Sequence, residues 1–466
     1  MRKYFIPDPL ELNEQCLDNI FSHFDKVLKK KKNDKFIISV SGGSDSVLLL
    51  YLFIKYFNGD QDKIIVSHIN HHLRNDSDVD ESFVSILGKK LNIETHIKNL
   101  NPKMIPKSDS VESWARKGRY DSLNNIMKET SADWIVTAHH ANDQAETILM
   151  NLSQKTGLFG IGGMKEINNK VIRPLLPFSK DYLMNIIKKY TIPYIVDSSN
   201  NNINHKRNFI RNVVIDPWEK SNPDLIKAIA TTADNFQEWQ YSMLYFIKKF
   251  TDKYSLKNKD GSFLIEKKEL KTLPPIARVC VFQLLTNSIG QLRKYDIENI
   301  KNLFDKDIVG NIFRTKNNYT LLNDRKFIII KQSQIKEKKY IELSIGQKYN
   351  FYGYDYIINN YFEDFSFSEN PNDEYIDLNK VENKKLVLRF WKSGDRFKPL
   401  GMSGKQKISD FLINNKVNYF EKDYQTVLTA DDKIIWVCGY RIDDSVKINR
   451  DTKNIMRVNR KFNRPF

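Results

Sequence analysis

Short apolar runs alternate with amphipathic stretches in the first part of the chain. Residues 36–40, 64–69 and 134–138 are brief, apolar and rich in β-branched side chains, which is typical of buried strands. The stretches between them carry apolar residues at helical spacing, as in residues 77–91. A last strand is predicted at residues 194–196. Because strands that alternate with helices form parallel sheets, this pattern predicts an α/β domain with a doubly wound parallel sheet.

The helical pattern lengthens after residue 215. Residues 218–249 form one broad amphipathic stretch, and two later apolar runs, at residues 327–330 and 349–358, are predicted strands. We expect four parts: the parallel-sheet domain in residues 1–215, a mainly helical middle domain in 216–335, a strand-containing connection and linker in 336–383, and a small mixed α/β C-terminal domain in 384–466.

Composition narrows the class of protein. The chain has 466 residues and a formal net charge of +17, which favours a polyanionic partner. Cys16, Cys280 and Cys438 lie far apart, which argues against a disulfide framework or a cysteine metal site. No apolar run reaches the roughly 20 residues of a membrane span, and no signal peptide is evident. We therefore expect a cytoplasmic protein with reduced thiols and no membrane partner.

Six small polar residues, Ser41–Ser46, follow the first predicted strand directly. Gly42 and Gly43 among them permit a tight turn and close backbone approach. A helix is predicted from Val47, so the free N–H groups at its start would face an anion. The segment lacks the Gly-Lys-Ser/Thr ending of a Walker loop. Its position and composition favour a phosphate-binding loop over an ordinary strand-to-helix turn.

Polar residues also gather where the second strand ends. His68, His71 and His72 lie there, at the edge where open α/β sheets bind ligands. Packing and ligand binding are equally compatible with these histidines. On a later predicted helix, Arg116 and Arg119 share one face with Glu112, as in a surface ion pair, although a guanidinium also suits phosphate.

Two carboxylates lie at the start of the helix that follows the third strand. Asp143 and Glu146 have the D-x-x-E spacing of a capping box. That interpretation does not account for His139 and His140 before the helix or for Gln144 within it, so a chemical role stays open.

Several motifs together resemble one known family. The loop Ser41-Gly42-Gly43-Ser44-Asp45-Ser46 resembles the SGGxDS pyrophosphate loop of the N-type ATP pyrophosphatases, or PP-loop superfamily. Six further segments resemble those of the tRNA(Ile)-lysidine synthetases, in the family's order: His68–Arg74, Glu112–Tyr120, His139–Thr147, Arg173–Leu176, Asp197–Asn200 and Arg207–Arg211. Gly394–Met402 and Trp436–Ile442 are similar to its C-terminal GDRFxPLGM and WVxGxRI. The one departure is Asn142, where the family usually has Asp.

The resemblance implies an ATP-dependent ligase. Such an enzyme joins free lysine to C2 of the wobble cytidine of an isoleucine tRNA with a CAU anticodon. The cytidine O2 first attacks the α-phosphate of ATP and releases pyrophosphate, and the lysine ε-amine then displaces AMP. The codon read changes from AUG to AUA, and the amino acid accepted changes from Met to Ile.

The resemblance also implies roles for single residues. The expected ATP-binding residues are Ser41, Gly42, Gly43, Ser44, Asp45, Ser46, His68 and Arg116. Asp45 would carry Mg²⁺, and Arg116, with Arg119, would stabilise charge on the α-phosphate. Asp143 and Glu146 would bind the lysine ammonium, and one of them would accept its proton. The expected catalytic residues are Asp45, Arg116, Asp143 and Glu146.

A basic and aromatic stretch begins near Lys384. Its cations suit phosphate contact, and Trp391 and Phe397 suit base stacking, although an ordinary small domain with surface lysines has the same composition. The expected tRNA contacts are Arg207, Arg211, Arg389, Arg396, Lys398 and Lys405. Arg207 and Arg211 fit ATP equally well.

Two other functions fit parts of the sequence. A PP-loop tRNA thiolase would need a cysteine nucleophile or an iron–sulfur ligand set, yet no cysteine lies between Cys16 and Cys280. A non-catalytic RNA-binding protein agrees with the charge but leaves the ATP motifs unexplained.

Overall fold

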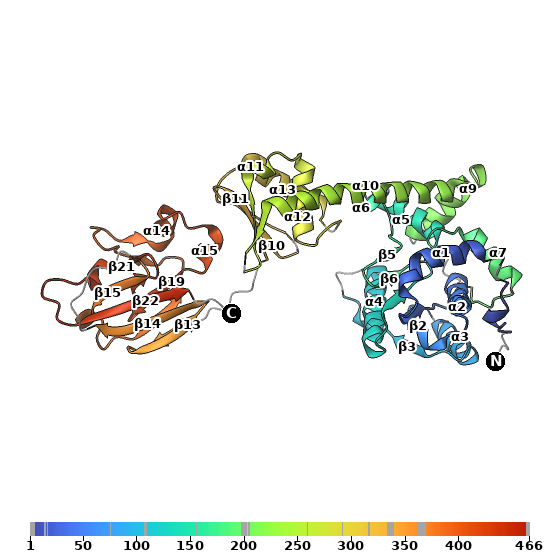
Figure 1. Ribbon diagram of the computed structural model, residues 1–466, viewed down its shortest axis with the longest axis horizontal. Coiled ribbons are helices and arrows are strands. Elements are labelled where there is room, and N and C mark those ends of the chain that lie inside the picture. The colour runs from blue at the N-terminus through green and yellow to red at the C-terminus, as the bar shows by residue number, and fades with distance from the viewer. Residues whose placement is uncertain are drawn as a thin grey trace. The chain divides into compact units, whose positions relative to one another are not determined.

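The computed structural model divides into two compact units, Met1–Phe246 and Ile247–Phe466 (Figure 1). It describes residues 5–13, 15, 17–74, 76–106, 110–154, 156–196, 203, 206–258, 260–290, 292–315, 317–332, 340–361 and 370–462. The Asp197–Asn200 motif and Cys16 lie outside the described residues.

A six-stranded sheet forms the centre of the first unit, in the order β3-β2-β1-β4-β6-β5. Its strands are β1 Phe36–Ser39, β2 Ile64–Asn70, β3 Thr95–Asn99, β4 Trp134–Val136, β5 Ile167–Asn168 and β6 Val171–Ile172. All neighbouring pairs are parallel except β5 with β6. The parallel α/β fold predicted from the sequence is confirmed.

Helices cover both faces of this sheet, because side chains of a strand alternate between faces. Phe36 and Ile38 are buried with helices α1, α2, α3 and α7, whereas Ile37 is buried with α4. The helices of the unit are α1 Asp18–Leu28, α2 Ser44–Tyr56, α3 Ser77–Lys90, α4 Val111–Glu129, α5 Ala141–Ser153, α6 Leu158–Ile161, α7 Lys180–Lys189, α8 Lys206–Phe209, a π-helical turn Ile210–Ile215, α9 Asp216–Ser221 and α10 Leu225–Tyr254, which continues past Phe246.

The connections reverse direction at β1. The chain passes from β1 to β2 and β3 on one side and then crosses to β4 on the other. In open α/β sheets, ligands bind beyond the carboxyl ends of the strands at such a switch point. Ser41–Ser46 lie there.

The prediction of a strand at residues 194–196 is wrong. The sheet ends with the β5–β6 hairpin instead, and residues 192–196 belong to no strand. The N–H of Ile195 donates to the carbonyl of Gly42 at 2.9 Å, so this apolar segment is an extended support for the loop after β1.

The second unit starts with a small helical and β region. Helices α11 Lys267–Leu270, α12 Pro275–Leu285 and α13 Lys294–Lys306 accompany a five-stranded antiparallel sheet, in the order β7-β8-β11-β10-β9. Its strands are β7 Ser255–Lys257, β8 Phe263–Glu266, β9 Ile312–Arg314, β10 Tyr319–Asn323 and β11 Phe327–Gln332. The sequence predicted a mainly helical middle domain here and one of these strands, β11; it did not predict α11 or the other four strands.

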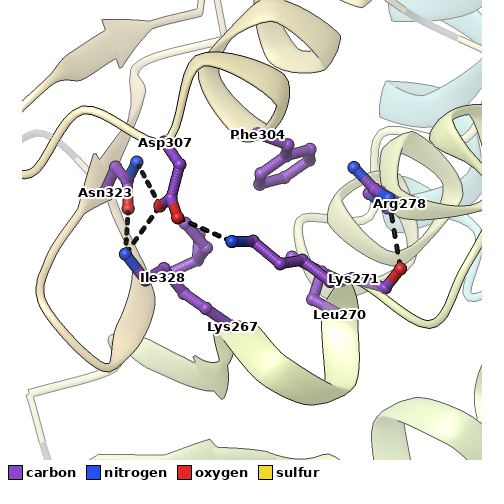
Figure 2. A pocket seen from close by; sticks show the side chains of 8 residues that line it. All are labelled: Lys267, Leu270, Lys271, Arg278, Phe304, Asp307, Asn323 and Ile328. Carbon is purple, nitrogen blue, oxygen red and sulfur yellow. Dashed lines mark hydrogen bonds and ion pairs between the residues drawn. The ribbon is translucent and has the colours of Figure 1, made fainter.

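Asp307 closes α13 in a narrow polar pocket (Figure 2). Its carboxylate accepts from Lys267 Nζ at 2.7 Å and from Lys271 Nζ at 2.6 Å. These hydrogen bonds lower the pKa of Asp307. The lysines of this pocket therefore have a partner within the protein, and their arrangement stabilises the connection between α11 and α13.

Two further antiparallel sheets form the C-terminal part of the second unit. Their orders are β12-β16-β19-β20-β21 and β13-β14-β22-β15, and β17 and β18 form a separate hairpin. The elements are β12 Tyr340–Leu343, β13 Gln347–Phe351, β14 Tyr354–Tyr361, β15 Asp373–Asp377, β16 Leu386–Phe390, β17 Arg396–Phe397, β18 Gln406–Lys407, α14 Ile408–Asn414, α15 Tyr419–Asp423, β19 Thr426–Ala430, β20 Lys433–Val437, β21 Arg441–Ile442 and β22 Ile455–Phe462. Strands from residues 340–377 thus pair with strands after residue 384.

Candidate active site

The loop after β1 is held by its own hydroxyl groups. Ser46 Oγ donates to the carbonyl of Gly43 at 2.9 Å and accepts from the N–H of Ser41 at 3.1 Å. Gly42 has φ +92°, a left-handed conformation that glycine adopts without strain. Helix α2 begins at Ser44, so its first N–H groups, which lack intrahelical acceptors, face the end of the sheet. This is the geometry of an anion-binding loop.

Asp45, in the first turn of α2, is paired with a residue that the sequence analysis missed. The Nζ of Lys180 lies 2.5 and 2.7 Å from the two carboxylate oxygens of Asp45 and 2.9 Å from Ser44 Oγ. Lys180 is the first residue of α7. A positive charge at the N-terminus of a helix is unfavourable because the helix dipole is positive there. This unfavourable position was the feature of the sequence that indicated another role for Lys180.

The carboxylates of α5 lie on the same side of the sheet. Helix α5 begins at Ala141, and the N–H of His140 donates to Asp143 Oδ2 at 3.1 Å. The capping box predicted from Asp143 and Glu146 is therefore wrong: Asp143 is the third helical residue and caps the helix with His140. Glu146 lies one turn further on and has no capping role.

Glu146 is fully buried and binds two arginines. Arg207 Nε and Arg211 Nε each donate to one of its oxygens at 2.5 Å, and Arg207 Nη2 donates to Asp143 Oδ1 at 3.2 Å. Burial lowers the pKa of Arg211, but its bond to Glu146 outweighs this and raises it. Burial raises the pKa of Asp143, but the charges of His140 and Arg207 outweigh this and lower it.

The His140 ring lies between Asp45 and Asp143. Its Nε2 lies 3.7 Å from Asp45 Oδ2 and 3.5 Å from Asp143 Oδ2. The phosphate-loop aspartate and the carboxylate pair of α5 are therefore separated by a single imidazole ring. Asp45 and Asp143 are almost one hundred positions apart in the sequence.

Two further arginines, Arg119 and Arg173, lie close enough to His139 to affect its pKa. The Nε atoms of Arg119 and Arg173 are buried and have no hydrogen-bond partner in the described part of the chain. Burial, reinforced by neighbouring Arg116, Arg207 and Arg173, lowers the pKa of Arg119. The predicted residue Arg116 is exposed on α4, 5.4 Å from the Tyr120 ring centroid. Arg173 Nη1 donates to the carbonyl of Lys165 at 2.8 Å. The Nε donors that remain on the two guanidinium groups are suited to a phosphate ligand.

Two histidines of the site, His71 and His139, are kept neutral at pH 7 by pKa values well below the ordinary one. Burial, followed by the charge of Arg119, lowers the pKa of His71 to about 4. Burial also lowers the pKa of His139 to about 3, with the Arg173 charge acting in the same direction. His68, predicted to bind ATP, is buried in β2, and its Nδ1 donates to the carbonyl of Val40 at 2.9 Å. This bond fixes the strand that precedes the loop.

A possible cation site occurs on the surface beside β2. Ligand atoms of His72, Asp78 and Glu81 lie within 4.8 Å of one another. Asn70 Nδ2 already donates to Asp78 at 3.2 Å and to Glu81 at 3.0 Å. An amide thus satisfies these carboxylates within the protein.

The glycine-rich segment after α5 is fixed rather than free. Residues 158–161 form α6. The Gln144 side chain makes two hydrogen bonds to the backbone of Met164, donating to its carbonyl at 2.9 Å and accepting from its N–H at 2.7 Å. Gln237 and Gln240 of α10 donate to the carbonyls of Gly162 and Leu158 at 2.6 and 2.7 Å. This explains Gln144, which the sequence left without a role.

The predicted tRNA contacts in the second unit differ in accessibility. Arg389 forms a two-fold pair with Asp395, at 2.8 and 3.0 Å, and Lys398 pairs with Asp444 at 2.9 Å. Arg396 and Lys405 are exposed.

The base-stacking prediction is wrong for Phe397 and stays a prediction for Trp391, which is half-buried. Phe397 is 2% exposed, and Trp391 packs against the same core and donates to the carbonyl of Lys422 at 2.6 Å. Phe397 is therefore a core residue, whereas Trp391 is fixed by its indole N–H and keeps part of its ring exposed.

Comparisons with known proteins agree with this arrangement. Residues 17–217 match the model of the PP-loop domain, and residues 386–459 match that of the TilS substrate C-terminal domain. The chain is 30% identical over 464 residues to the tRNA(Ile)-lysidine synthase of Clostridium tetani, covering 95% of this chain and 97% of that one. It is 28% identical over 430 residues to the enzyme of the same name from Parabacteroides distasonis, covering 91% and 94%. The chain belongs to the tRNA(Ile)-lysidine synthase family.

Proposed function

We propose that this protein uses ATP to join lysine to C2 of the wobble cytidine of tRNA(Ile) with a CAU anticodon. One observation carries the proposal: Asp45 of the phosphate loop and Asp143 of the carboxylate pair both lie within 3.7 Å of one ring nitrogen of His140. An ATP site and a site for an ammonium group are therefore adjacent. That adjacency is what adenylation followed by amine attack requires.

In the first step, the cytidine O2 attacks the α-phosphorus of ATP and pyrophosphate leaves. The N–H groups and hydroxyls of Ser41–Ser46 bind the phosphates, and Arg116, with Arg119, offsets the charge that develops on the α-phosphate. In the second step, the lysine ε-amine attacks C2 and AMP departs with the O2 oxygen. Asp143 and Glu146 bind the ammonium, and one of them accepts its proton.

Lysine must compete for its carboxylates. Arg207 and Arg211 already occupy Glu146, and Arg207 also reaches Asp143. Asp143 retains 16% side-chain exposure, whereas Glu146 has none. An incoming ammonium therefore meets Asp143 first, and it reaches Glu146 only as a guanidinium moves away. Arg207 and Arg211 are then free to contact an RNA phosphate.

Mg²⁺ fits the oxygens at the loop. Asp45 offers a carboxylate and Ser44 a hydroxyl, and Mg²⁺ is commonly bound through one or two carboxylates together with substrate phosphates. When bound, the ion would neutralise charge on the phosphates. The protein residues that would hold it are Asp45 and, through its hydroxyl, Ser44.

The deciding experiment measures pyrophosphate release from the full-length protein. We expect release to require the CAU tRNA, and transfer of radiolabelled lysine to require both tRNA and ATP. Asp45→Asn should abolish release and leave tRNA binding in a gel shift nearly unchanged. Sulfur incorporation, or RNA binding with no ATP turnover, would contradict the proposal.

The place of action is also a proposal. Among the described residues, no helix is long and apolar enough to cross a bilayer. Since its substrates would be tRNA, ATP and free lysine, we propose that the protein acts in the cytoplasm.

A further inference from the structure

We propose that Lys180 is a phosphate-binding residue of this site, and that it holds the cation position beside Asp45 while the site is empty of substrate. The inference rests on the proposed ATP-dependent function and adds a residue to it.

The Lys180 ammonium group occupies a position built for a cation. Its three hydrogens are matched by three oxygens, two from Asp45 at 2.5 and 2.7 Å and one from Ser44 at 2.9 Å. The side chains of Lys180 and Asp45 are 32% and 26% exposed, so the pair is partly withdrawn from water. These are the same oxygens that suit Mg²⁺, and two cations cannot share them.

Three hydrogen bonds fix the backbone of residues 178–180, so only the side chain of Lys180 has to move. Its N–H donates to Asn142 Oδ1 at 2.9 Å, and the preceding Ser179 accepts from the N–H of Tyr182 at 3.3 Å. One residue further back, Phe178 accepts from the N–H of Ala141 at 2.9 Å. The start of α7 is thus attached to the start of α5, next to the proposed lysine site.

Asn142 has a clear structural role here. A carboxylate at this position would accept the same N–H but would add a negative charge beside the Lys180 backbone. The neutral amide keeps the attachment without offering the ammonium a competing anion.

The loop itself contains no lysine, unlike the Walker loop. When ATP arrives with its metal ion, Asp45 exchanges the ammonium for the ion, and the nearest new anions are the phosphates bound by the same loop. The four-carbon stem of lysine allows this short movement. Lys180 then offsets the charge that the pyrophosphate gains as its bond to the α-phosphorus breaks.

The test uses the full-length chain with two substitutions, Lys180→Met and Lys180→Arg, and Lys188→Met as the control. Lys188 is an exposed residue near the other end of the same helix. The affinity for a non-cleavable ATP analogue with Mg²⁺ is measured by calorimetry. We expect at least a tenfold loss for Lys180→Met, partial retention for Lys180→Arg and no change for Lys188→Met. Wild-type analogue affinity in a folded Lys180→Met protein would overturn the phosphate role.

A second measurement tests occupation of the cation position. Mn²⁺ binding without nucleotide is followed by electron paramagnetic resonance. Lys180→Met should bind Mn²⁺ more tightly than the wild type because Asp45 is released, and adding Asp45→Asn should abolish that gain. Unchanged Mn²⁺ affinity would overturn this part. Neither measurement involves lysine or tRNA, so a wild-type protein that fails to transfer lysine would refute the proposed reaction while leaving the Lys180 result interpretable.

Discussion

Glu146 has a structural role as well as a chemical one, because its buried carboxylate accepts hydrogen bonds from two arginines. We predict that Glu146→Gln permits pyrophosphate release but blocks lysine transfer. The free energy of unfolding should also fall by about 1.5–3 kcal/mol, since two hydrogen bonds to a charged, buried group are weakened.

Urea unfolding and radiolabelled lysine transfer check both parts of this prediction. Glu129→Gln is the control, since Glu129 pairs with Lys98 at the surface and its loss should change stability by less than about 1 kcal/mol. Full lysine transfer by folded Glu146→Gln would exclude Glu146 from the ammonium site.

The neutral histidines predict a pH dependence of stability. In the unfolded chain a histidine takes up a proton as the pH falls through about 6.5. In the folded protein His71 and His139 stay neutral until their pKa values of about 4 and about 3. The unfolded state then binds more protons, so stability falls between about pH 6.5 and 4.

His139→Gln removes one of these two histidines, so it should reduce the loss of unfolding free energy at low pH by about 1–2 kcal/mol. The expected effect is modest because both imidazole rings are partly exposed to solvent. Urea unfolding at pH 7.0, 5.5 and 4.5 measures it, with His96→Gln at the outer strand β3 as the control. An equally steep fall in both variants would contradict the prediction.

Single residues show what sequence could predict about the site. The loop serines and glycines, Asp45, Asp143 and Glu146 do lie around one centre, because their motifs follow strand ends. Lys180 was missed because its partner lies 135 positions away, and a single lysine on a helix has many ordinary explanations. The guanidinium groups on Glu146 were assigned to external anions because spacing does not reveal an internal partner.

Among the elements, the glycine-rich segment after α5 gives a clear test. Gly163 has φ +61°, and a Cβ there would lie 2.5 Å from Gln144 Oε1. Gly163→Ala should therefore cost about 1–3 kcal/mol, through backbone strain and broken Gln144 hydrogen bonds. Gly157→Ala is the matched control, because nothing lies within 4 Å of its Cβ position and its φ is −87°. Equal melting temperatures for the two variants would refute this account.

Elements were predicted best where packing and periodicity agree. Strands β1, β2 and β4 are buried runs, and their helices carry apolar faces, so both could be read from the sequence. Residues 194–196 were misread because an apolar segment that supports a loop has the same composition as an edge strand. The capping box failed because D-x-x-E spacing does not fix the first helical residue, which here follows the extended His140.

At the scale of the whole molecule, the charge of +17 predicts salt-dependent tRNA binding. Arg396→Gln with Lys405→Gln removes two exposed cations from the full chain. If both contact phosphate, affinity for tRNA should fall, and the slope of log affinity against log salt should flatten by about 0.7–0.9 per contact. Arg389→Gln is the control, because that side chain is bound to Asp395; it should lower stability and leave the slope unchanged. A wild-type slope in the double variant would remove this surface from the tRNA interface.

Such substitutions are preferable to a deletion that starts at residue 384. Strand β12 pairs with β16, and β14 pairs with β22, so that deletion would leave unpaired strands. The sequence could not reveal this pairing, because the partners are far apart along the chain and the segment between them has the composition of a linker.

The position of β22 has a consequence for synthesis of the chain. This last strand lies inside its sheet, between β14 and β15, and pairs with both. Until residues 455–462 leave the ribosome, β14 and β15 present open edges to other nascent chains. At about 5–20 residues per second, translation of residues 362–454 leaves the edge of β14 open for several seconds. A chain released before residue 455 would lack the inner strand of this sheet, and the edges of β14 and β15 would stay open to strands of other molecules.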